Sequence, residues 1–566
     1  MNKPLTKLER IKSDSRFLRG TIDLGLADAT TGAISDDDTK LLKFHGSYMQ
    51  DDRDIRDERR RQKLEPDYRF MVRVRLPGGV LTTKQWLDLD ALANEYASSG
   101  LRITTRQTFQ FHGVRKEHLR DMIGGINDAG LSTLAACGDD VRNVICSVNP
   151  ELSSTHAEVY DWALKIMHHV KPQTMAYKEL WIDKAERTSD GTQDHEPLLG
   201  KDYLPRKFKF GIAIPPYNDI DVFVQDVGLI AILDDGHRLT GFNLAAGGSM
   251  GATAGNPATY PRLGDLIGYV SKTHILDVCW HAVAVQRDFG DRTDRLHARL
   301  KYTIDDRGLA WFRDVLQSRL AFPIEPPRDV HFEHNGDRFG WIEGEDGRWH
   351  LTLQIPSGRL HDDATQTRQT GMRKIARVHT GDIRLTCDQN VIIASVAAKD
   401  REHIDRLVEA HGLDGYKTAS GIRQHAIACV ALPTCGLAMA ESERYLPTIL
   451  DKMEQLLDTH GLREEPIHFR MSGCPNGCSR PYIGEIALVG RAVGRYDLRI
   501  GADHRGERLN AMYLENVDED RILAALDALF ARFADERGEG ERFGDFVVRI
   551  EQIDPPKRRP ALEYAA

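Results

Sequence analysis

Four cysteines in the last third of the chain have the type and spacing needed to bind metal. Cys429 and Cys435 form a C-x5-C pair, and Cys474 and Cys478 form a C-x3-C pair within MSGCPNGCSR. Pro, Asn and Gly are turn residues, so the chain between the second pair folds back and presents both sulfurs to one centre. Four thiolates from two loops are ligands for a [4Fe–4S] cluster or for structural zinc.

The cysteine spacing favours an iron–sulfur cluster over two alternatives. Zinc knuckles commonly use C-x2–4-C pairs, which this chain matches only in part, and the ferredoxin run C-x2-C-x2-C is not present. Unliganded core cysteines are the third interpretation. The remaining cysteines show no pairing, and we expect them to be buried, apolar thiols: Cys137, Cys146, Cys279 and Cys387.

Three segments of the first half place basic side chains on one face of a strand. FMVRVRL alternates apolar residues with Arg73 and Arg75, and YLPRKFKFGIAIPP puts Lys207 and Lys209 opposite apolar residues. Arg142 follows a predicted turn in DDVRNVIC. As one strand, LRITTRQTFQFHG has a polar face composed of Arg102, Thr104, Arg106, Thr108, Gln110 and His112. One such strand is the wet face of an ordinary sheet, but three together indicate an anion site.

The elements that position these groups are repeated along the chain. RVRLPGG near Pro77 corresponds to LQIPSG near Pro356, and LRITTRQ corresponds to IRLTCDQ. Cys146 of NVICSVNP corresponds to Cys429 of IACVALP, and GFNLAAGG corresponds to RYDLRIGA. Because the matches keep the same order, we predict two related halves packed about a pseudo-twofold axis.

The two halves differ in the chemistry that they carry. In the alignment of the repeats, Asp388 replaces Arg106, and Ala394 replaces His112. The second half has lost the basic face, while the first half keeps only Cys146 of the cysteine pattern. This division predicts one shared active site, which binds an anion beside a metal cluster.

Periodicity indicates a mixed α and β protein, and we predict the α+β class. Apolar residues at helical spacing predict a helix over 159–170, with a capping box at Thr155 and Glu158. A second amphipathic helix is predicted over 519–537, ending at Gly538. The glycine-rich stretch GGSMGATAG predicts a loop rather than a dinucleotide site, so we expect the chain itself to bind neither NADPH nor flavin.

Length and composition limit the classes of protein. A chain of 566 residues predicts several domains. No apolar run reaches about 18 residues and the N-terminus lacks a secretory signal, so we expect a cytoplasmic protein. A net charge of −9 argues against nucleic acid as the main partner. The charge-dense residues 1–62 predict either a solvated arm or a docking segment for another subunit.

Several motifs together resemble a known family. RLPGGVLTTKQW, TTRQTFQFHG, YLPRKFKF, QRDFGDRTDR and the two cysteine pairs are similar to the haemoprotein (beta) subunits of assimilatory NADPH-dependent sulfite reductases, within the nitrite/sulfite reductase superfamily. The resemblance runs end to end. It implies a duplicated fold with two ferredoxin-like half-domains and two mixed α/β sirohaem and iron–sulfur domains.

The resemblance also implies domain boundaries. We expect an N-terminal arm that docks a flavoprotein at 1–62, followed by ferredoxin-like half-domain 1 at 63–138 and the sirohaem-binding α/β domain of the first repeat at 139–330. Ferredoxin-like half-domain 2 is expected at 331–412, and the iron–sulfur and sirohaem α/β domain of the second repeat at 413–566.

Cofactors and residue roles follow from the same resemblance. It implies a [4Fe–4S] cluster on the four cysteines, with Cys478 also bridging to the iron of sirohaem. Sirohaem carries eight carboxylates, so it needs many basic partners, and the implied residues at the macrocycle are Arg102, Arg106 and His112. The residues implied to hold the sulfite oxygens are Arg73, Arg142, Lys207 and Lys209.

The implied activity is the six-electron reduction of sulfite to sulfide in assimilatory sulfate reduction and cysteine biosynthesis. The implied partner is a flavoprotein (FAD/FMN) NADPH reductase subunit in a hetero-oligomer, with ferredoxin as the alternative donor. The nearest alternative function is an assimilatory nitrite reductase with the same cofactors, against which Lys207 and Lys209 together favour sulfite. A non-catalytic electron carrier or zinc-stabilised scaffold is an alternative of another class.

Overall fold

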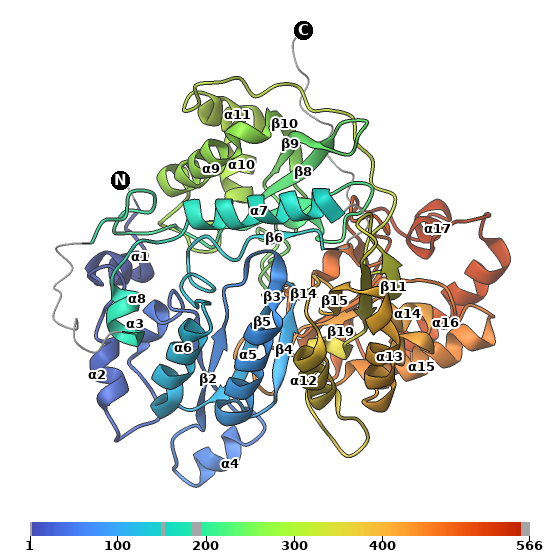
Figure 1. Cartoon of the computed structure of the whole chain (residues 1–566), viewed down its shortest axis with the longest axis horizontal. Helices are drawn as coiled ribbons and strands as arrows, with labels where there is room; N and C mark the ends of the chain where they lie inside the picture. The colour runs from blue at the N-terminus through green and yellow to red at the C-terminus, as the bar shows by residue number, and fades with distance from the viewer. Residues whose placement is uncertain (1–2, 149–152, 183–193, 556–566) are drawn as a thin grey trace.

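The computed structural model describes residues 3–148, 153–182 and 194–555. These residues form four five-stranded sheets with helices packed around them. In Figure 1 the first sheet lies at the lower left with α5 (Thr83–Tyr96) and α6 (Leu119–Asp128), and the sheet that ends in β10 lies at the top. The second half lies at the right. Helices and sheets are mixed, as predicted for the α+β class.

Two of the sheets exchange a strand between the halves. Their strand orders are β1-β2-β5-β4-β13 and β11-β12-β15-β14-β3. β13 (Arg359–Leu360) from the second half pairs with β4, and β3 (Val80–Thr82) from the first half pairs with β14. The other strands are β1 (Ser47–Asp51), β2 (Tyr68–Arg73), β4 (Leu101–Thr104), β5 (Thr108–Val114), β11 (Gly340–Glu343), β12 (Trp349–Leu353), β14 (Asp382–Leu385) and β15 (Val391–Val396). Each half thus completes a sheet of the other.

The other two sheets have matching topologies. Their orders are β10-β9-β8-β7-β6 and β16-β17-β18-β19-β20. In chain order, the first two pairings of each sheet are parallel and the last two are antiparallel. The strands are β6 (Ile145–Cys146), β7 (Phe210–Ala213), β8 (Val227–Leu233), β9 (Leu239–Ala246), β10 (Asp265–Ser271), β16 (Ala426–Ala428), β17 (Phe469–Ser472), β18 (Ile486–Ala492), β19 (Arg495–Ile500) and β20 (Ala511–Val517). The two related halves predicted from the sequence are confirmed.

Equivalent turns in the two halves share an unusual backbone. Short 3-10 turns occur at Pro77–Gly79 and Pro356–Gly358, and each contains a left-handed residue, Gly78 with φ 60° and Ser357 with φ 53°. Gln107 and Gln389 are also left-handed, with φ of 51° and 70°. Because L-residues other than Gly rarely adopt this region, its recurrence supports a common origin of the halves.

The segment 101–114 is a hairpin and not one continuous strand. β4 ends at Thr104, the chain turns through residues 105–107, and β5 begins at Thr108. Arg106 therefore lies in the turn. The predicted polar face survives because antiparallel pairing places Gln110 directly opposite Arg102.

The predicted helices fare differently. α16 (Glu519–Glu536) confirms the amphipathic helix that was expected to end before Gly538. α7 (Ser153–His169) already includes Ser153, so Thr155 lies inside the helix and the predicted capping box is wrong. The Thr155 hydroxyl instead donates to the carbonyl of His237 at 2.5 Å. The remaining longer helices are α9 (Ile275–Phe289), α10 (Leu300–Arg307), α11 (Leu309–Gln317), α12 (Arg368–Val378), α13 (Arg401–Ala410) and α15 (Leu446–Thr459), and the shorter ones are α8 (Ala176–Trp181), α14 (Gly421–Gln424) and α17 (Phe543–Arg549).

Most of the N-terminal segment is packed against the first half. It forms α1 (Lys7–Asp14), α2 (Ile22–Ala27), α3 (Asp36–Leu41) and β1, which pairs with β2. Leu18, Ile22 and Phe44 are buried within it. Residues 7–51 are therefore not a solvated arm, because their few apolar residues are used to cover the sheet. α4 (Arg56–Arg61) has no buried residue and lies at the lower edge of the view in Figure 1.

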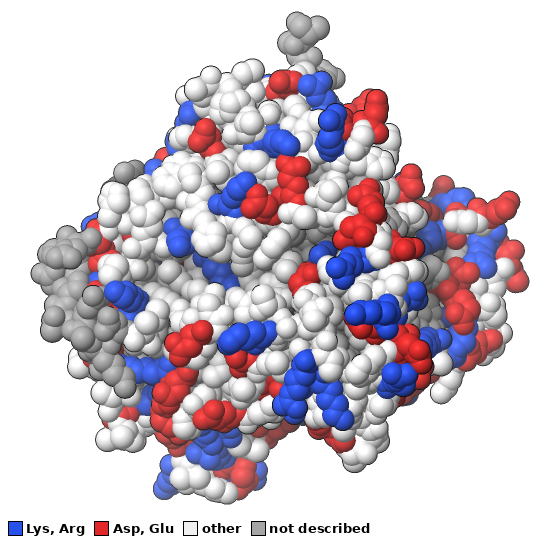
Figure 2. All heavy atoms as spheres, in the orientation of Figure 1, with Lys and Arg blue, Asp and Glu red and all other residues white. Residues whose placement is uncertain are grey.

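Surface charge of both signs is intermingled over the face shown in Figure 2. The basic residues predicted to bind an anion are mostly buried or half-buried rather than part of a surface field. No helix in the described ranges is long and apolar enough to cross a membrane.

Candidate active site

The four cysteines meet at one edge of the β16–β20 sheet. Cys429 follows β16, and Cys474 and Cys478 follow β17. Because β16 and β17 are parallel neighbours, their carboxyl ends lie together. The amide of Cys429 donates to the carbonyl of Met471 at 3.2 Å.

Burial and the charge of a neighbouring cysteine raise the pKa of three of the four cysteine thiols. Burial raises the pKa of Cys429 to about 12 and the pKa of Cys435 and Cys474 to about 11, and the charge of Cys478 is the next cause in all three cases. Thiolates crowded in this way need a cationic centre among them. A metal ligand must be deprotonated, so binding metal and losing these protons are coupled.

The four cysteines can hold either an iron–sulfur cluster or zinc, and a backbone hydrogen bond reaches one of the four sulfurs. The amide of Gly473 donates to the sulfur of Cys429 at 3.3 Å, a hydrogen bond of the kind that tunes iron–sulfur clusters.

The basic face is a row of cross-strand neighbours on the first sheet. Arg73 lies opposite Gln110, Gln110 opposite Arg102, and Arg102 opposite Arg359. Side chains of directly opposed residues share a face, and His112 follows on that face two residues after Gln110. The row thus contains three of the predicted residues and adds Arg359 from the second half.

Arg142, Lys207 and Lys209 meet at the amino ends of β6 and β7. Val141 bridges Phe208, and the amide of Arg142 donates to the carbonyl of Phe208 at 2.8 Å. The guanidinium of Arg142 is held by the carbonyl of Gly138 at 2.6 and 2.9 Å. Within the described residues, neither lysine ammonium has a hydrogen bond or ion pair. These two cations are therefore available to a ligand.

Two lysines in this surrounding lose their proton easily. Burial, followed by the charges of Lys209 and Arg299, holds the pKa of Lys207 well below its ordinary value. Burial, followed by the charges of Arg106 and Arg299, also holds the pKa of Lys209 well below its ordinary value. The charge of Cys478 opposes this shift in part. Lys209 is therefore close enough to Cys478 to feel its charge, so the cationic group of one half adjoins the thiols of the other.

Buried donors without partners line this site. The Nε atoms of Arg73 and Arg106 and both ring nitrogens of His112 are buried and have no hydrogen-bond partner among the described residues. Leaving such groups unpaired is costly. Cys478 is the one exposed cysteine, and its carbonyl accepts a hydrogen bond from Thr105 of the first half at 3.0 Å. The arrangement fits a large anionic ligand near Cys478.

Arg102 is already paired with protein groups. Its guanidinium donates to Glu443 at 2.7 Å and to the carbonyl of Ala428 at 3.1 Å. Arg106 donates to the side chain of Gln225 at 2.7 Å and to the carbonyl of Asn143. Burial lowers the pKa of Arg106 to about 9. Of these two arginines, Arg106 therefore has the greater need of an anionic partner.

Sequence reasoning missed three residues of this region. Arg299, paired with Asp226 at 3.0 Å, acts on both lysines. Arg359 enters through the exchanged strand, and Glu443 binds Arg102 and Arg359. The repeat contained a signal for Arg359, because PSGR aligns with PGGV. The burial expected for the four unpaired cysteines is confirmed, but Cys137 is not in an apolar setting, since Arg73 donates to its sulfur at 3.5 Å.

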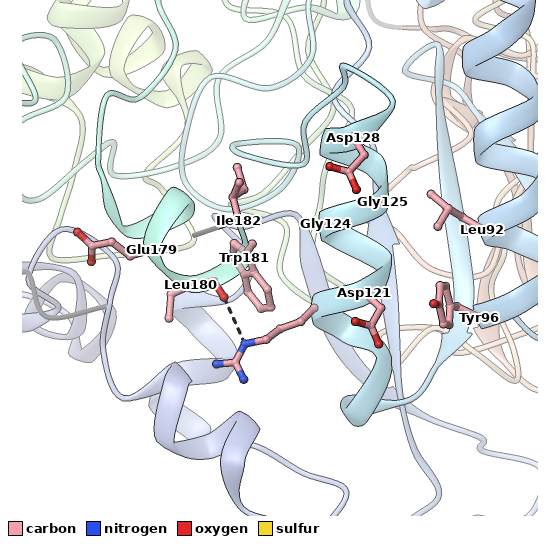
Figure 3. A pocket seen from close by; sticks show the side chains of 11 residues that line it. Leu92, Tyr96, Asp121, Gly124, Gly125, Asp128, Glu179, Leu180, Trp181 and Ile182 are labelled. Atoms are coloured by element: carbon pink, nitrogen blue, oxygen red, sulfur yellow. Dashed lines mark hydrogen bonds between the residues drawn. The ribbon is translucent and has the colours of Figure 1, made fainter. Parts of the chain in front are cut away.

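A cavity of about 800 Å³ adjoins the basic row. It is bordered by His112, Arg359 and Glu443, and by Pro433 and Thr434 beside Cys435. A different cavity of about 380 Å³, shown in Figure 3, lies between α6 and α8. Its lining includes Arg120, which donates to the carbonyl of Leu180 at 3.3 Å, and none of the predicted site residues. The cavity of about 800 Å³, which borders the basic row, is therefore the one that belongs to the candidate site.

Comparison with known proteins gives the same class. The model described as "Nitrite and sulphite reductase 4Fe-4S domain" matches residues 137–324, and "Nitrite/Sulfite reductase ferredoxin-like half domain" matches residues 61–129 and 342–411. The structure of Mycobacterium tuberculosis NirA protein shares the fold, with a TM-score of 0.78 at 24% identity over 97% of each chain. The duplicated fold is that of the nitrite and sulfite reductases.

Curated relatives narrow the assignment. "Sulfite reductase [NADPH] hemoprotein beta-component" of Myxococcus xanthus is 56% identical over 558 residues, 99% of each chain. The protein of the same name from Oceanobacillus iheyensis is 54% identical, over 98% of this chain and 96% of its own. The chain belongs to the sulfite reductase hemoprotein beta-component family.

Proposed function

We propose that the chain is the catalytic haemoprotein subunit of a sulfite reductase, which reduces sulfite to sulfide with six electrons in assimilatory sulfate reduction and cysteine biosynthesis. The observation that carries this proposal is the pair Lys207 and Lys209, which have no protein partner among the described residues, with Lys209 near enough to the exposed Cys478 to interact with its charge. The name of the relatives favours sulfite over the alternative of nitrite.

The residues fit the cofactors of this family. Cys429, Cys435, Cys474 and Cys478 would hold the [4Fe–4S] cluster, and Cys478 would also face the sirohaem iron. The unpaired nitrogens of Arg106 and His112 match the need of the sirohaem carboxylates for hydrogen-bond donors, and the unpaired donor of Arg73 is available to the substrate oxyanion. When bound, the two centres supply the electrons and the iron that binds the sulfur atom of the substrate.

The protein groups have separate tasks in this scheme. Arg73 and Arg142 would bind the oxyanion, because a guanidinium group presents several N–H donors to an anion. Preorganised cations around an oxyanion stabilise the charge that develops as S–O bonds break. Lys207 and Lys209 add a proton source, since their lowered pKa makes each ammonium a better acid.

We further propose that electrons come from a flavoprotein NADPH reductase subunit that docks near α4. The names of the relatives include NADPH and a beta-component. The glycine-rich loop contacts the cysteine turn, because the amide of Ala252 donates to the carbonyl of Pro475 at 2.9 Å. Arg53, just before α4, donates to the carbonyl of Ala438 at 2.6 Å and so links this region to the Cys435 loop.

The predicted division at 63–138, 139–330, 331–412 and 413–566 is part of the same proposal. The ranges matched by the family models lie close to the first three of these segments. Limited proteolysis at residues 129–139 and 324–342 would test whether the boundaries are accessible.

The decisive experiment is an absorption spectrum of the anaerobically purified chain, before and after sulfite, with iron and zinc measured on the same sample. We expect sirohaem bands that shift with sulfite and iron near five per chain, four from the cluster and one from the haem. A colourless protein that carries zinc would overturn the proposed function.

A further inference from the structure

Two arginines from different halves face each other in the first sheet. Arg102 of β4 is directly opposite Arg359 of β13. Like charges in this position destabilise a sheet. Neither arginine can move away, because Arg102 is 3% exposed and Arg359 is anchored to Ser99 by its guanidinium at 2.9 and 3.2 Å.

The carboxylate of Glu443 compensates part of the positive charge of the two arginines. One of its carboxylate oxygens accepts from Arg102 Nε at 2.7 Å, and the other accepts from Arg359 Nε at 2.7 Å. The Glu443 side chain is 16% exposed. A mostly buried carboxylate between two guanidinium groups leaves one net positive charge in the trio, and removing it would leave both arginines uncompensated.

The same residue is tied to a cysteine of the proposed cluster. The amide of Glu443 donates to the carbonyl of Cys429 at 3.0 Å, while Arg102 donates to the carbonyl of Ala428 at 3.1 Å. Next to Glu443, the hydroxyl of Ser442 donates to the carbonyl of Met471 at 2.7 Å. The carboxylate therefore joins the basic row, the exchanged strand and the Cys429 segment.

We propose that Glu443 is a positioning residue that fixes Cys429 against the basic row and lowers the reduction potential of the cluster through its negative charge. Net charge and nearby hydrogen bonds set the potentials of iron–sulfur clusters. Glu443 acts through Cys429, Arg102 and Arg359 and does not touch the substrate. The inference rests on the proposed function, because it needs the cluster on the four cysteines.

The test compares Glu443→Gln with the wild-type holoprotein. Glutamine keeps the size of the side chain and one acceptor oxygen but removes the charge. We expect the iron content to stay near that of the wild type, the midpoint potential of the cluster to become more positive, and turnover with a chemical reductant to fall about tenfold. Glu443→Ala, which also removes the contacts, should lose at least half of the cluster iron.

Glu454→Gln is the matched control. Glu454 also accepts two hydrogen bonds from one arginine, Arg423, at 2.8 and 2.5 Å, but it has no contact with the basic row. The midpoint potential of the cluster and the iron content of Glu454→Gln should equal those of the wild type. A wild-type potential and wild-type turnover in Glu443→Gln would overturn the inference and leave the proposed function intact, whereas wild-type protein without cluster iron would overturn the proposed function itself.

Discussion

Lys207 and Lys209 differ from the arginines around them because they can give up a proton. Burial comes first among the causes that lower the pKa of each, and neighbouring cations come next. An anion bound between them would reverse part of this shift, since opposite charge favours the protonated form. Substrate binding would thereby recruit the protons that its reduction consumes.

Replacing Lys209 by Met should keep the cofactors and remove most of the turnover. Loss of one preorganised donor commonly costs about 10²–10³ in turnover number, and we expect an effect of that size with a chemical reductant. Sirohaem bands and iron content should be unchanged. Lys201→Met, at an exposed lysine in the same segment, is the control. Unchanged turnover in Lys209→Met would contradict the assigned role.

As pH rises, turnover should begin to fall at a lower pH than it would if Lys209 had the pKa of an ordinary lysine. The protonated ammonium is the active form, and the folded pKa of Lys209 lies below 10.5. Activity is therefore present below the folded pKa and is lost as pH rises through it. In a pH profile with a chemical reductant, Lys209→Arg, which stays charged but does not release its proton, should lower turnover and remove the part of the alkaline limb that Lys209 contributes. An identical limb in both proteins would assign the pH dependence to another group.

At the scale of elements, the exchange of β3 and β13 builds the site. β13 carries Arg359 into the first sheet, beside Arg102. The hairpin β4–β5 then places Gln110 and His112 on the same face, and the parallel pairs β6–β7 and β16–β17 each bring two loops to one edge. Each functional group is therefore held by a regular element or by a segment next to the end of one.

The exposed helix α4 is the element that we expect to meet the electron donor. Reversing two of its exposed charges, with Arg60→Glu and Arg61→Glu, should lower turnover driven by the flavoprotein at least fivefold and spare turnover with a chemical reductant. Substitution is preferable to deletion of residues 1–62, because β1 and the buried Phe44 belong to the first half. Arg406→Glu on α13 is the control. Equal loss in both assays would refute docking at α4.

At the scale of the whole molecule, a buried charge network joins the two halves. Asp221 of the first half pairs with Arg470 at 2.7 Å and with Arg480 at 2.9 Å. Arg480 also pairs with Asp388 at 2.6 Å. Asp388 is the counterpart of Arg106 in the repeat, so the position that serves the site in one half serves the interface in the other.

Asp221→Asn should destabilise the chain by about 3–5 kcal/mol, because it leaves two buried arginines with less compensation. Urea unfolding at equal cofactor content would measure the loss, and Asp234→Asn, at an exposed ion pair, should cause no measurable change. An unchanged midpoint for Asp221→Asn would show that Asp388 alone balances both arginines.

Local sequence determined a large part of this protein. The cysteine pairs, the basic strand faces, the repeat and the helix at Glu519–Glu536 depend on residue type and on spacing over a few residues. Side-chain alternation in strands and turn chemistry in the cysteine loop are local physics, and they hold wherever the segment is placed. Lys207 and Lys209 could be identified in this way because they alternate with Phe208 and Phe210. The structure buries both phenylalanines fully on the opposite face.

Only the tertiary structure decided which of these segments meet. The strand exchange, the bridge of Glu443 between Arg102 and Arg359, and the contact of Cys137 with Arg73 join residues far apart in sequence. Such contacts depend on how two halves dock, and no local pattern encodes that docking. The lowered pKa of the lysines has the same origin, since burial and neighbouring charge exist only after the chain has folded.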